Sequence, residues 1–217
     1  MDEVRPFYKD GAKSSNKAYY LTGRPSEPKL EPNVKLTAAQ ANRNQQTEQN
    51  IRDATHANRD FKASAGKTPY SLGQQLYNQG NTRGNCGEMA AVAMYRACYP
   101  PCSLSVDEIW MLTLISQELA PLRFSKIQFG HTVAVLGREN EASDARWVVD
   151  PWANICCTMS KYSETIMKKL TQWQTQGKRI AAQTQTGLCW VQPLHGMVVG
   201  IVGRKVHFDW LRVDKIG

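Results

Sequence analysis

Cys86, His131 and Asp150 are the residues of this chain whose side chains could cooperate in breaking an amide bond. Cys86 lies between a glycine-containing turn and an apolar run typical of a helix, in the segment TRGNCGEMAAVAMY. A cysteine attacks a carbonyl carbon as its thiolate, and a helix N-terminus stabilises that anion through its dipole and its free N–H groups. We therefore expect Cys86 to be a nucleophile. The alternative for this cysteine, taken alone, is a small apolar residue that opens a core helix.

His131 and Asp150 are the expected partners of the nucleophile. His131 follows a glycine at the start of the apolar strand TVAVLG, and Asp150 ends the strand WVVD. If residues 131–137 and 146–150 form an antiparallel hairpin, the start of one strand lies beside the end of the other. The carboxylate would then orient the imidazole and fix its tautomer. Taken singly, a strand-edge histidine is more often a surface or structural residue, and the aspartate could equally be a turn residue.

Amide hydrolysis also needs hydrogen-bond donors for the oxyanion of its tetrahedral intermediate. The backbone N–H of the nucleophile can supply one, and an amide side chain shortly before it a second. Gln79 is preferred to Asn85, because a residue adjacent to the nucleophile is poorly placed to face the same oxygen. Gly84 and Gly87 are expected to line the cleft and leave room for a substrate carbonyl. Trp152 is expected to line the cleft or shield the histidine–aspartate pair from water, with a core position as the alternative.

This chemistry requires no cofactor, and the remaining cysteines do not indicate a metal site. Cys98 and Cys102 have a spacing that zinc could use, but the only later pair is the adjacent Cys156 and Cys157, which is poor geometry for two tetrahedral ligands. Six cysteines in 217 residues are too few for a disulfide scaffold. We expect no bound metal, and structural thiols apart from Cys86.

Composition restricts the partners. The formal net charge of +8 favours acidic partners, which include nucleic acid, anionic membranes and acidic protein surfaces. The chain has no run of five Lys or Arg residues and no nucleic-acid-binding signature, so nucleic acid is not the expected partner. No apolar stretch approaches the roughly 18 residues of a membrane span, and no classical signal peptide is recognisable at the N-terminus.

The expected domain organisation is an N-terminal extension over residues 1–66 and a catalytic domain over residues 67–217. Residues 1–35 are rich in proline, glycine and charge, which predicts either a disordered segment or an arm laid on the domain. A polar helix is expected over residues 37–62, with Thr37 as its N-cap. The extension is a candidate segment for secretion, chaperone binding or partner binding.

The catalytic domain is expected to be α+β, with helices first and a mostly antiparallel sheet second. Its expected helices cover residues 71–77, 85–99 (with Asn85 as N-cap), 106–119 and 163–176. The helix over 106–119 is favoured over a buried strand, although the continuous apolar run is ambiguous. The expected strands cover residues 124–129, 131–137, 146–150, 188–192, 197–202 and 205–211.

The segments GNCGEMA, HTVAVLG and VVDPWAN, in this order, resemble the papain-like Cys-His-Asp effectors and toxins of bacteria. This group includes the YopT-like proteases, the SseI-like effectors and the deamidase domain of Pasteurella multocida toxin. The resemblance covers residues 84–154. It implies a papain-like cysteine hydrolase fold in which the nucleophile begins a helix packed on the sheet. It also implies that Cys86 is the nucleophile, His131 the base and Asp150 the orienting acid.

The resemblance also implies a function. The short interval between Cys86 and His131 resembles that of the toxin-type deamidases more than that of the YopT-like proteases, so we expect a glutamine deamidase. The alternatives are a cysteine endopeptidase of the same fold, a transglutaminase or other acyl transferase, and a non-enzymatic interaction module. The expected setting is secretion from a bacterium into the cytoplasm of a target cell. The expected partners are a target-cell protein substrate and a secretion chaperone or an immunity or activating partner.

Overall fold

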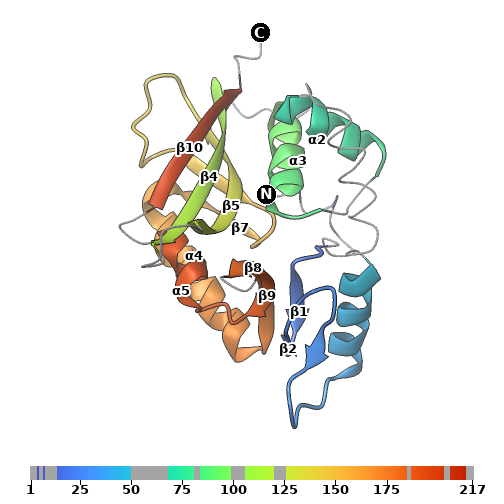
Figure 1. Ribbon diagram of the computed structural model, residues 1–217. Coiled ribbons are helices and arrows are strands. Elements are labelled where there is room, and N and C mark those ends of the chain that lie inside the picture. The colour runs from blue at the N-terminus through green and yellow to red at the C-terminus, as the bar shows by residue number, and fades with distance from the viewer. Residues whose placement is uncertain are drawn as a thin grey trace.

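The computed structural model describes residues 4, 7, 14–49, 68–80, 84–98, 106–119, 126–184, 187–202 and 206–213. It has a mixed α+β architecture with antiparallel sheets, which confirms the expected class (Figure 1). The central sheet contains, in spatial order, β10 (Val206–Val213), β4 (Glu108–Leu119), β5 (Lys126–Gly137), β6 (Trp147–Asp150) and β7 (Ile155–Thr158). All neighbouring strands in it are antiparallel.

Two smaller sheets and several helices complete the described part of the chain. The first sheet has the order β1 (Lys17–Tyr19), β8 (Lys178–Thr184) and β9 (Gly187–Val191), and the second pairs β2 (Leu21–Thr22) with β3 (Lys29–Leu30). The helices are α2 (Pro69–Asn78), α3 (Cys86–Cys98), α4 (Met159–Thr175), α5 (Gly196–Val199) and the 3-10 helix η2 (Gly200–Val202). Residues 38–49 are also helical.

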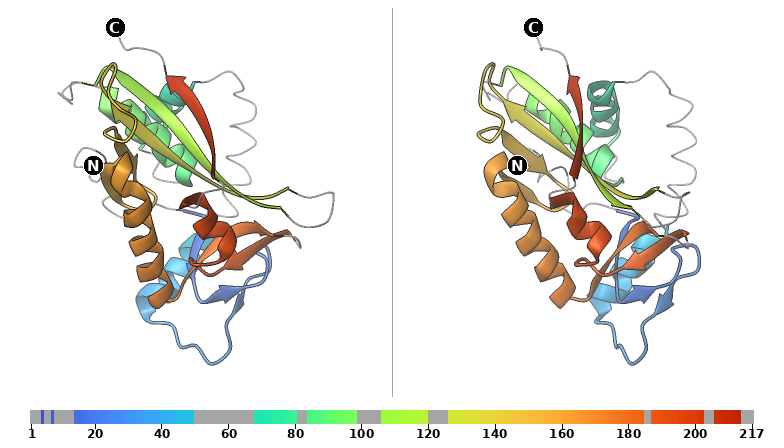
Figure 2. Two further views of the ribbon diagram at one scale, coloured as in Figure 1. Left: turned by 90° about the vertical axis from the view of Figure 1, so that its left-hand side faces the viewer. Right: turned by 60° about the vertical axis from the view of Figure 1, so that its left-hand side comes forward.

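Around the middle of β5 the central sheet is buried on both faces. Alternate residues of a strand point to opposite faces, and in β5 Val133 belongs to one apolar cluster and Ala134 to the other. Ala134 packs with residues of α3 such as Met94, whereas Val133 packs with residues of α4 and η2 such as Ile166 and Ile201. Helices therefore cover the sheet on each side (Figure 2).

The sequence predicts a helix over residues 106–119, and this prediction is wrong: residues 108–119 form β4. Ile109 lies in the cluster on the α3 side, while Trp110 and Leu112 lie in the cluster on the α4 side. A strand buried on both faces has a continuous apolar sequence without alternation. Periodicity therefore could not distinguish this strand from a buried helix.

The strand predicted over residues 197–202 is also wrong, because these residues form most of α5 and all of η2. The carbonyl of His195 accepts hydrogen bonds from the N–H groups of Val198 and Val199, which begins a helical turn. Val198 and Ile201 are buried three positions apart, a helical spacing that also suits a short apolar run. The structure further contains β7 and β8, which the sequence analysis does not predict.

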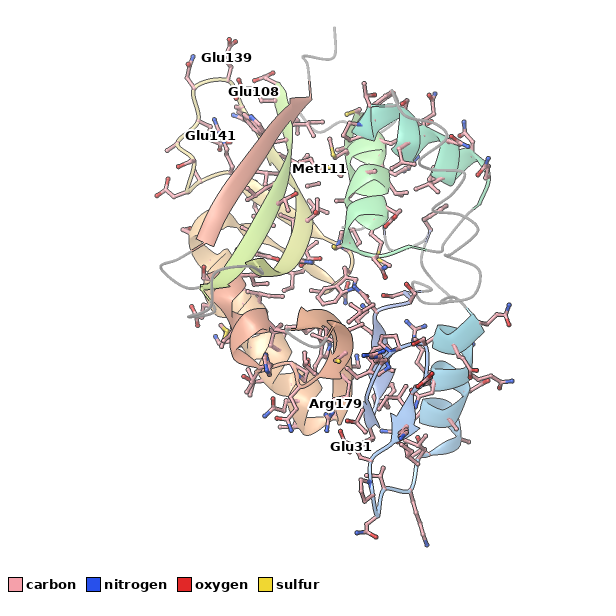
Figure 3. All side chains as sticks on the ribbon, in the orientation of Figure 1. Glu31, Glu108, Met111, Glu139, Glu141 and Arg179 are labelled. Atoms are coloured by element: carbon pink, nitrogen blue, oxygen red, sulfur yellow. The ribbon has the colours of Figure 1, made fainter. Side chains whose placement is uncertain are left out.

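The sequence predicts either a disordered segment or an arm laid on the domain over the first 35 residues, and the second holds for residues 14–35, which contain three strands. Strand β1 pairs with β8, so the N-terminal extension is hydrogen-bonded to the expected catalytic domain. Arg179 of β8 also donates to both carboxylate oxygens of Glu31, at 2.6 and 2.7 Å (Figure 3). The expected arm is thus part of the fold, while residues 50–67, where the polar helix and the domain boundary are expected to end, lie outside the described residues.

The predicted start of the helix at Thr37 is confirmed. The Thr37 hydroxyl accepts from the N–H of Gln40, whose side chain accepts in turn from the Thr37 N–H. This reciprocal capping fixes the start of the helix at 38–49. Helix α4 begins at Met159, earlier than expected, with Thr158 as its N-cap residue. Within the described part of the chain, no helix combines the length and apolar composition that crossing a membrane requires.

Candidate functional site

Cys86 is the first residue of α3. Gly84 precedes it with φ +141°, and a Cβ on Gly84 would lie 2.6 Å from the Cβ of Glu88. The Glu88 carboxylate accepts from the N–H of Asn85 at 2.9 Å, which closes the turn. The N–H groups of a first helical turn have no acceptor within the helix. The nucleophile candidate therefore begins a helix whose first N–H groups are suited to bind an anion.

His131 and Asp150 are brought together by the hairpin of β5 and β6. Val135 pairs with Val148 and Ala134 with Val149, so the start of β5 lies beside the end of β6. The Nε2 atom of His131 lies 2.8 Å from Oδ2 of Asp150, and neither residue has measurable exposure to solvent. The hairpin expected from the sequence thus places the two side chains in direct contact.

Asp150 is held as a carboxylate by three donors. Besides His131, the hydroxyl of Tyr162 donates to Oδ2 at 2.8 Å and the N–H of Ala153 donates to Oδ1 at 3.0 Å. Burial alone would raise the pKa of Asp150, but the charge of His131 and these hydrogen bonds lower it. Burial and the Asp150 charge raise the pKa of Tyr162, so its hydroxyl remains a donor. The carboxylate is therefore fixed in position and in charge.

His131 lies between Asp150, which orients its ring, and Cys86, with which it can exchange a proton. Burial lowers the pKa of His131, but the Asp150 carboxylate and the Cys86 thiol together raise it to about 10. Because Nε2 is bound to Asp150, Nδ1 is the ring nitrogen left to exchange a proton with the thiol. Nδ1 is buried and is not hydrogen-bonded to any of the described residues. The Cys86 thiol is nevertheless near enough to raise the pKa of the imidazole. Such contacts often shorten only when substrate binds.

Trp152 covers the imidazole. Its ring centroid lies 4.8 Å from that of His131, and only 3% of the residue is exposed. The ring also meets Trp173 at 5.1 Å, within the apolar cluster of α4. Trp152 therefore combines the two positions expected for it, since it shields the histidine–aspartate pair and belongs to the core. Excluding water strengthens the electrostatic interaction between His131 and Asp150.

Residues 14–17 reach the site, which the sequence did not indicate. Oδ1 of Asn16 accepts from the indole N–H of Trp152 at 2.9 Å and also from the hydroxyl of Ser14. The ammonium of Lys17 donates to the carbonyl of Trp152 at 2.6 Å and lies 4.6 Å from the centroid of its ring. The run KAYYLT, which follows SSN, has the aromatic and β-branched residues of a strand. That signal could have located β1, but nothing local indicates the contacts with Trp152.

The two candidate side-chain donors for the oxyanion have different surroundings. Asn85 is bound to the N-terminal segment: its Oδ1 accepts from the Ser14 hydroxyl at 2.9 Å, and its Nδ2 donates to the Ser15 hydroxyl at 3.0 Å. Gln79 is the exposed C-cap residue of α2. Neither placement supports the expected role, so the N–H groups at the start of α3 are the donors that the geometry favours.

The glycines expected to line a cleft also differ. A Cβ on Gly87 would meet no heavy atom within 4 Å, so the space beside this first-turn residue is open. Gly84, in contrast, is required by the backbone and by the close approach of Glu88. Open space at Gly87 suits the approach of a substrate to the neighbouring Cys86.

No group of three metal-ligating side chains occurs within the described residues, and Cys102 lies outside them.

Cys156 is exposed and the adjacent Cys157 is half-buried. Burial raises the pKa of Cys157, which makes this thiol a poor nucleophile at neutral pH. Cys157 is therefore a useful comparison for Cys86.

Lys17 and His131 should have opposite effects on how stability depends on pH. Burial lowers the pKa of Lys17 from 10.5 to about 7, so the unfolded chain binds more protons between these values and stability rises with pH. The pKa of His131 is raised from 6.5 to about 10, so its stabilisation is complete below pH 6.5 and is lost towards pH 10. The stability of Lys17→Met, relative to the unsubstituted protein, should therefore fall from pH 7 to pH 10.

Urea unfolding of both proteins at several pH values in this range measures that difference. A difference in unfolding free energy that stays constant with pH would show that Lys17 keeps an ordinary pKa in the folded protein.

Comparison with known proteins gives no match of any of three kinds: no family model, no curated protein and no solved structure is significantly similar to this chain.

Proposed function

We propose that this protein is a cysteine-dependent amide hydrolase whose reaction is carried out by Cys86, His131 and Asp150. The observation that carries this proposal is the buried pair of His131 and Asp150, 2.8 Å apart, electrostatically coupled to a thiol at the start of α3. A buried imidazole–carboxylate pair beside a helix-terminal thiol is the arrangement that nucleophilic acyl transfer uses. A purely structural thiol would not require it.

The reaction starts from a protonated imidazole beside the Cys86 thiol, which attacks as its thiolate. The raised pKa of His131 keeps its ring protonated at neutral pH, and the positive end of α3 favours a negative sulfur atom. The thiolate attacks the amide carbon and a C–S bond forms. The carbonyl oxygen becomes an oxyanion, which the N–H groups of the first turn of α3 can stabilise.

Breakdown of this intermediate requires a proton at the leaving nitrogen. Nδ1–H of His131 donates it, the C–N bond breaks, and the amine or ammonia leaves a thioester on Cys86. The neutral imidazole then takes a proton from water, which attacks the thioester. The C–S bond breaks, the carboxylic acid is released, and the starting charges are restored. Asp150 remains ionised throughout and holds the Nε2–H tautomer.

Glutamine side chains in a protein are the proposed substrate. The resemblance of the segments around the three residues to papain-like bacterial toxins supports this choice, together with the short interval between Cys86 and His131. The proposal includes a papain-like arrangement of α3 and the antiparallel sheet. It also includes secretion from a bacterium, action in the cytoplasm of a target cell, and an acidic target surface that would match the net charge of +8.

The proposal is tested by incubating the full chain with a blocked glutaminyl-glycine dipeptide and with denatured casein. We expect ammonia to be released from both substrates. The mass of each substrate should rise by the difference between an amide and a carboxylic acid, and the casein chains should not be cleaved. Cys86→Ala should abolish this activity, with a fall of at least roughly a thousandfold. Cys157→Ala should keep it.

New peptide fragments that depend on Cys86 would instead show an endopeptidase. Equal activity of Cys86→Ala and the unsubstituted protein would refute the proposed nucleophile.

A further inference from the structure

We propose that Lys17 is a positioning residue of the catalytic site: its ammonium group holds Trp152 in place over His131 and supplies the positive charge that stabilises the anionic thiol of Cys86. This inference rests on the proposed function, because it assigns a role in the same reaction. It also places an essential group of the site in β1, near the N-terminus and 69 residues before the nucleophile.

The first part of the argument is geometric. The ammonium of Lys17 donates to the Trp152 carbonyl at 2.6 Å, while the indole N–H of the same tryptophan is held by Asn16 at 2.9 Å. The Trp152 ring in turn lies 4.8 Å from the ring of His131. Two adjacent residues of the N-terminal segment therefore fix both the backbone and the side chain of the residue that covers the imidazole. A shift of Trp152 would admit water to the pair of His131 and Asp150.

The second part concerns charge. Lys17 is half-buried, its ammonium lies over the rings of Trp152 and Trp173, and desolvation makes its protonated form costly. The charges of Asp150 and Cys86 favour that protonated form. By reciprocity, a protonated Lys17 favours the anionic form of Cys86. The free-energy cost of keeping Lys17 protonated is therefore partly offset by the negative charge on Cys86 that the reaction needs.

The charged groups that act on Lys17 come from four elements of the fold. They are Lys178 of β8, Arg43 of the helix at 38–49, Asp150 of β6 and Cys86 of α3. The two cationic groups oppose its protonation and the two acidic groups support it. Removal of the proton from Cys86 therefore shifts the balance at Lys17 towards the charged form.

Lys178 offers a matched control. Its ammonium lies 4.8 Å from the centroid of Trp173, and that of Lys17 lies 5.1 Å from the same centroid. Burial lowers the pKa of both lysines, but the charges that act on Lys178 are those of Lys169 and Arg43, without Cys86 or Asp150. The two lysines thus share an aromatic partner and differ in their coupling to the site.

The experiment measures the rate at which iodoacetamide alkylates Cys86 in the full chain, with the labelled residue identified by peptide mass spectrometry. Lys17→Met should be alkylated about tenfold more slowly at pH 6, because a neighbouring positive charge shifts thiol ionisation by about one unit or more. Lys17→Arg should restore most of the rate. Lys178→Met, which removes a charge that opposes protonation of Lys17, should be alkylated no more slowly than the unsubstituted protein. The ratio of the unsubstituted rate to the Lys17→Met rate should fall towards one above pH 7, where Lys17 loses its proton.

A ratio that does not change with pH would overturn the charge assignment, because loss of a structural contact alone would slow alkylation equally at each pH. An equal effect of Lys178→Met would overturn the assignment to Lys17. If Lys17→Met does not fold, Lys17→Gln, which keeps a donor for the Trp152 carbonyl but has no charge, is compared by the same criteria.

The His131→Ala variant distinguishes a failure of the role of Lys17 from a failure of the proposed triad. If His131→Ala is alkylated as fast as the unsubstituted protein, the proposed triad is wrong. If His131→Ala is slow and Lys17→Met is fast, the triad stands and the role of Lys17 is refuted.

Discussion

Asp150→Asn should lower amide hydrolysis by roughly 10³- to 10⁴-fold while the chain remains folded, because the substitution reverses the hydrogen bond that fixes the imidazole tautomer. The N–H of Ala153 donates to Oδ1 of Asp150, so the oxygen of an asparagine would be retained there. Its NH₂ group would then face Nε2 of His131, which at present donates to Oδ2. The imidazole would have to accept at Nε2 and carry its proton at Nδ1. It could not accept a proton from Cys86.

The same substitution removes the main influence that raises the pKa of His131. Burial would then lower that pKa, and the ring would be neutral at pH 7. The thiol would lose its positively charged partner in the resting state, so alkylation of Cys86 at pH 7 should slow together with hydrolysis. The measurements are kcat/KM on the glutaminyl dipeptide and the rate of alkylation.

Asp144→Asn is the matched control, since Asp144 is an exposed aspartate of the loop between β5 and β6. It should leave both rates unchanged. Tyr162→Phe removes one donor to the Asp150 carboxylate and should have a much smaller effect than Asp150→Asn. Retention of activity by Asp150→Asn within tenfold of the unsubstituted protein would show that the carboxylate does not orient the base.

The pair of His131 and Asp150 could be predicted from the sequence because its cause is local. Residues 131–137 and 146–150 are two apolar runs separated by a short polar loop, and the loop fixes their antiparallel pairing. Side-chain parity then places His131 on the same face as Val133 and Val135. Cys86 could be located for a similar reason, since a glycine-bearing turn and an apolar helical run define the start of α3.

The contribution of the N-terminal segment could not be predicted, because long-range contacts fix it. Asn16 is 136 residues from Trp152, and Ser14 is 71 residues from Asn85. A polar, proline-containing sequence resembles a disordered arm until a partner strand is known, and that partner, β8, is itself not evident from the sequence. Strand β4 is mistaken for a helix for a different reason, since its burial on both faces removes the alternation that identifies a strand.

Gly73→Ala should destabilise the fold strongly, and it tests how α2 supports the helix that carries Cys86. A Cβ on Gly73 would lie 2.0 Å from the carbonyl oxygen of Ala91 and 3.0 Å from the Cβ of Tyr95, both in α3. The Ala91 contact is with backbone, so no change of rotamer can relieve it. The two helices would have to move apart, which opens the buried contact between them. The expected cost is about 3 kcal/mol or more.

Helix propensity and the close approach of α3 have opposite effects on the stability of Gly73→Ala. Alanine is favoured over glycine inside a helix by up to about 1 kcal/mol, so without the close approach Gly73→Ala would stabilise α2. Gly87→Ala is the control, because Gly87 is also helical but a Cβ there meets open space. Urea unfolding followed by circular dichroism should show a lower midpoint for Gly73→Ala and an equal or higher midpoint for Gly87→Ala. A stabilised Gly73→Ala would mean that α2 and α3 are farther apart than the structure places them, and that Cys86 depends less on their packing.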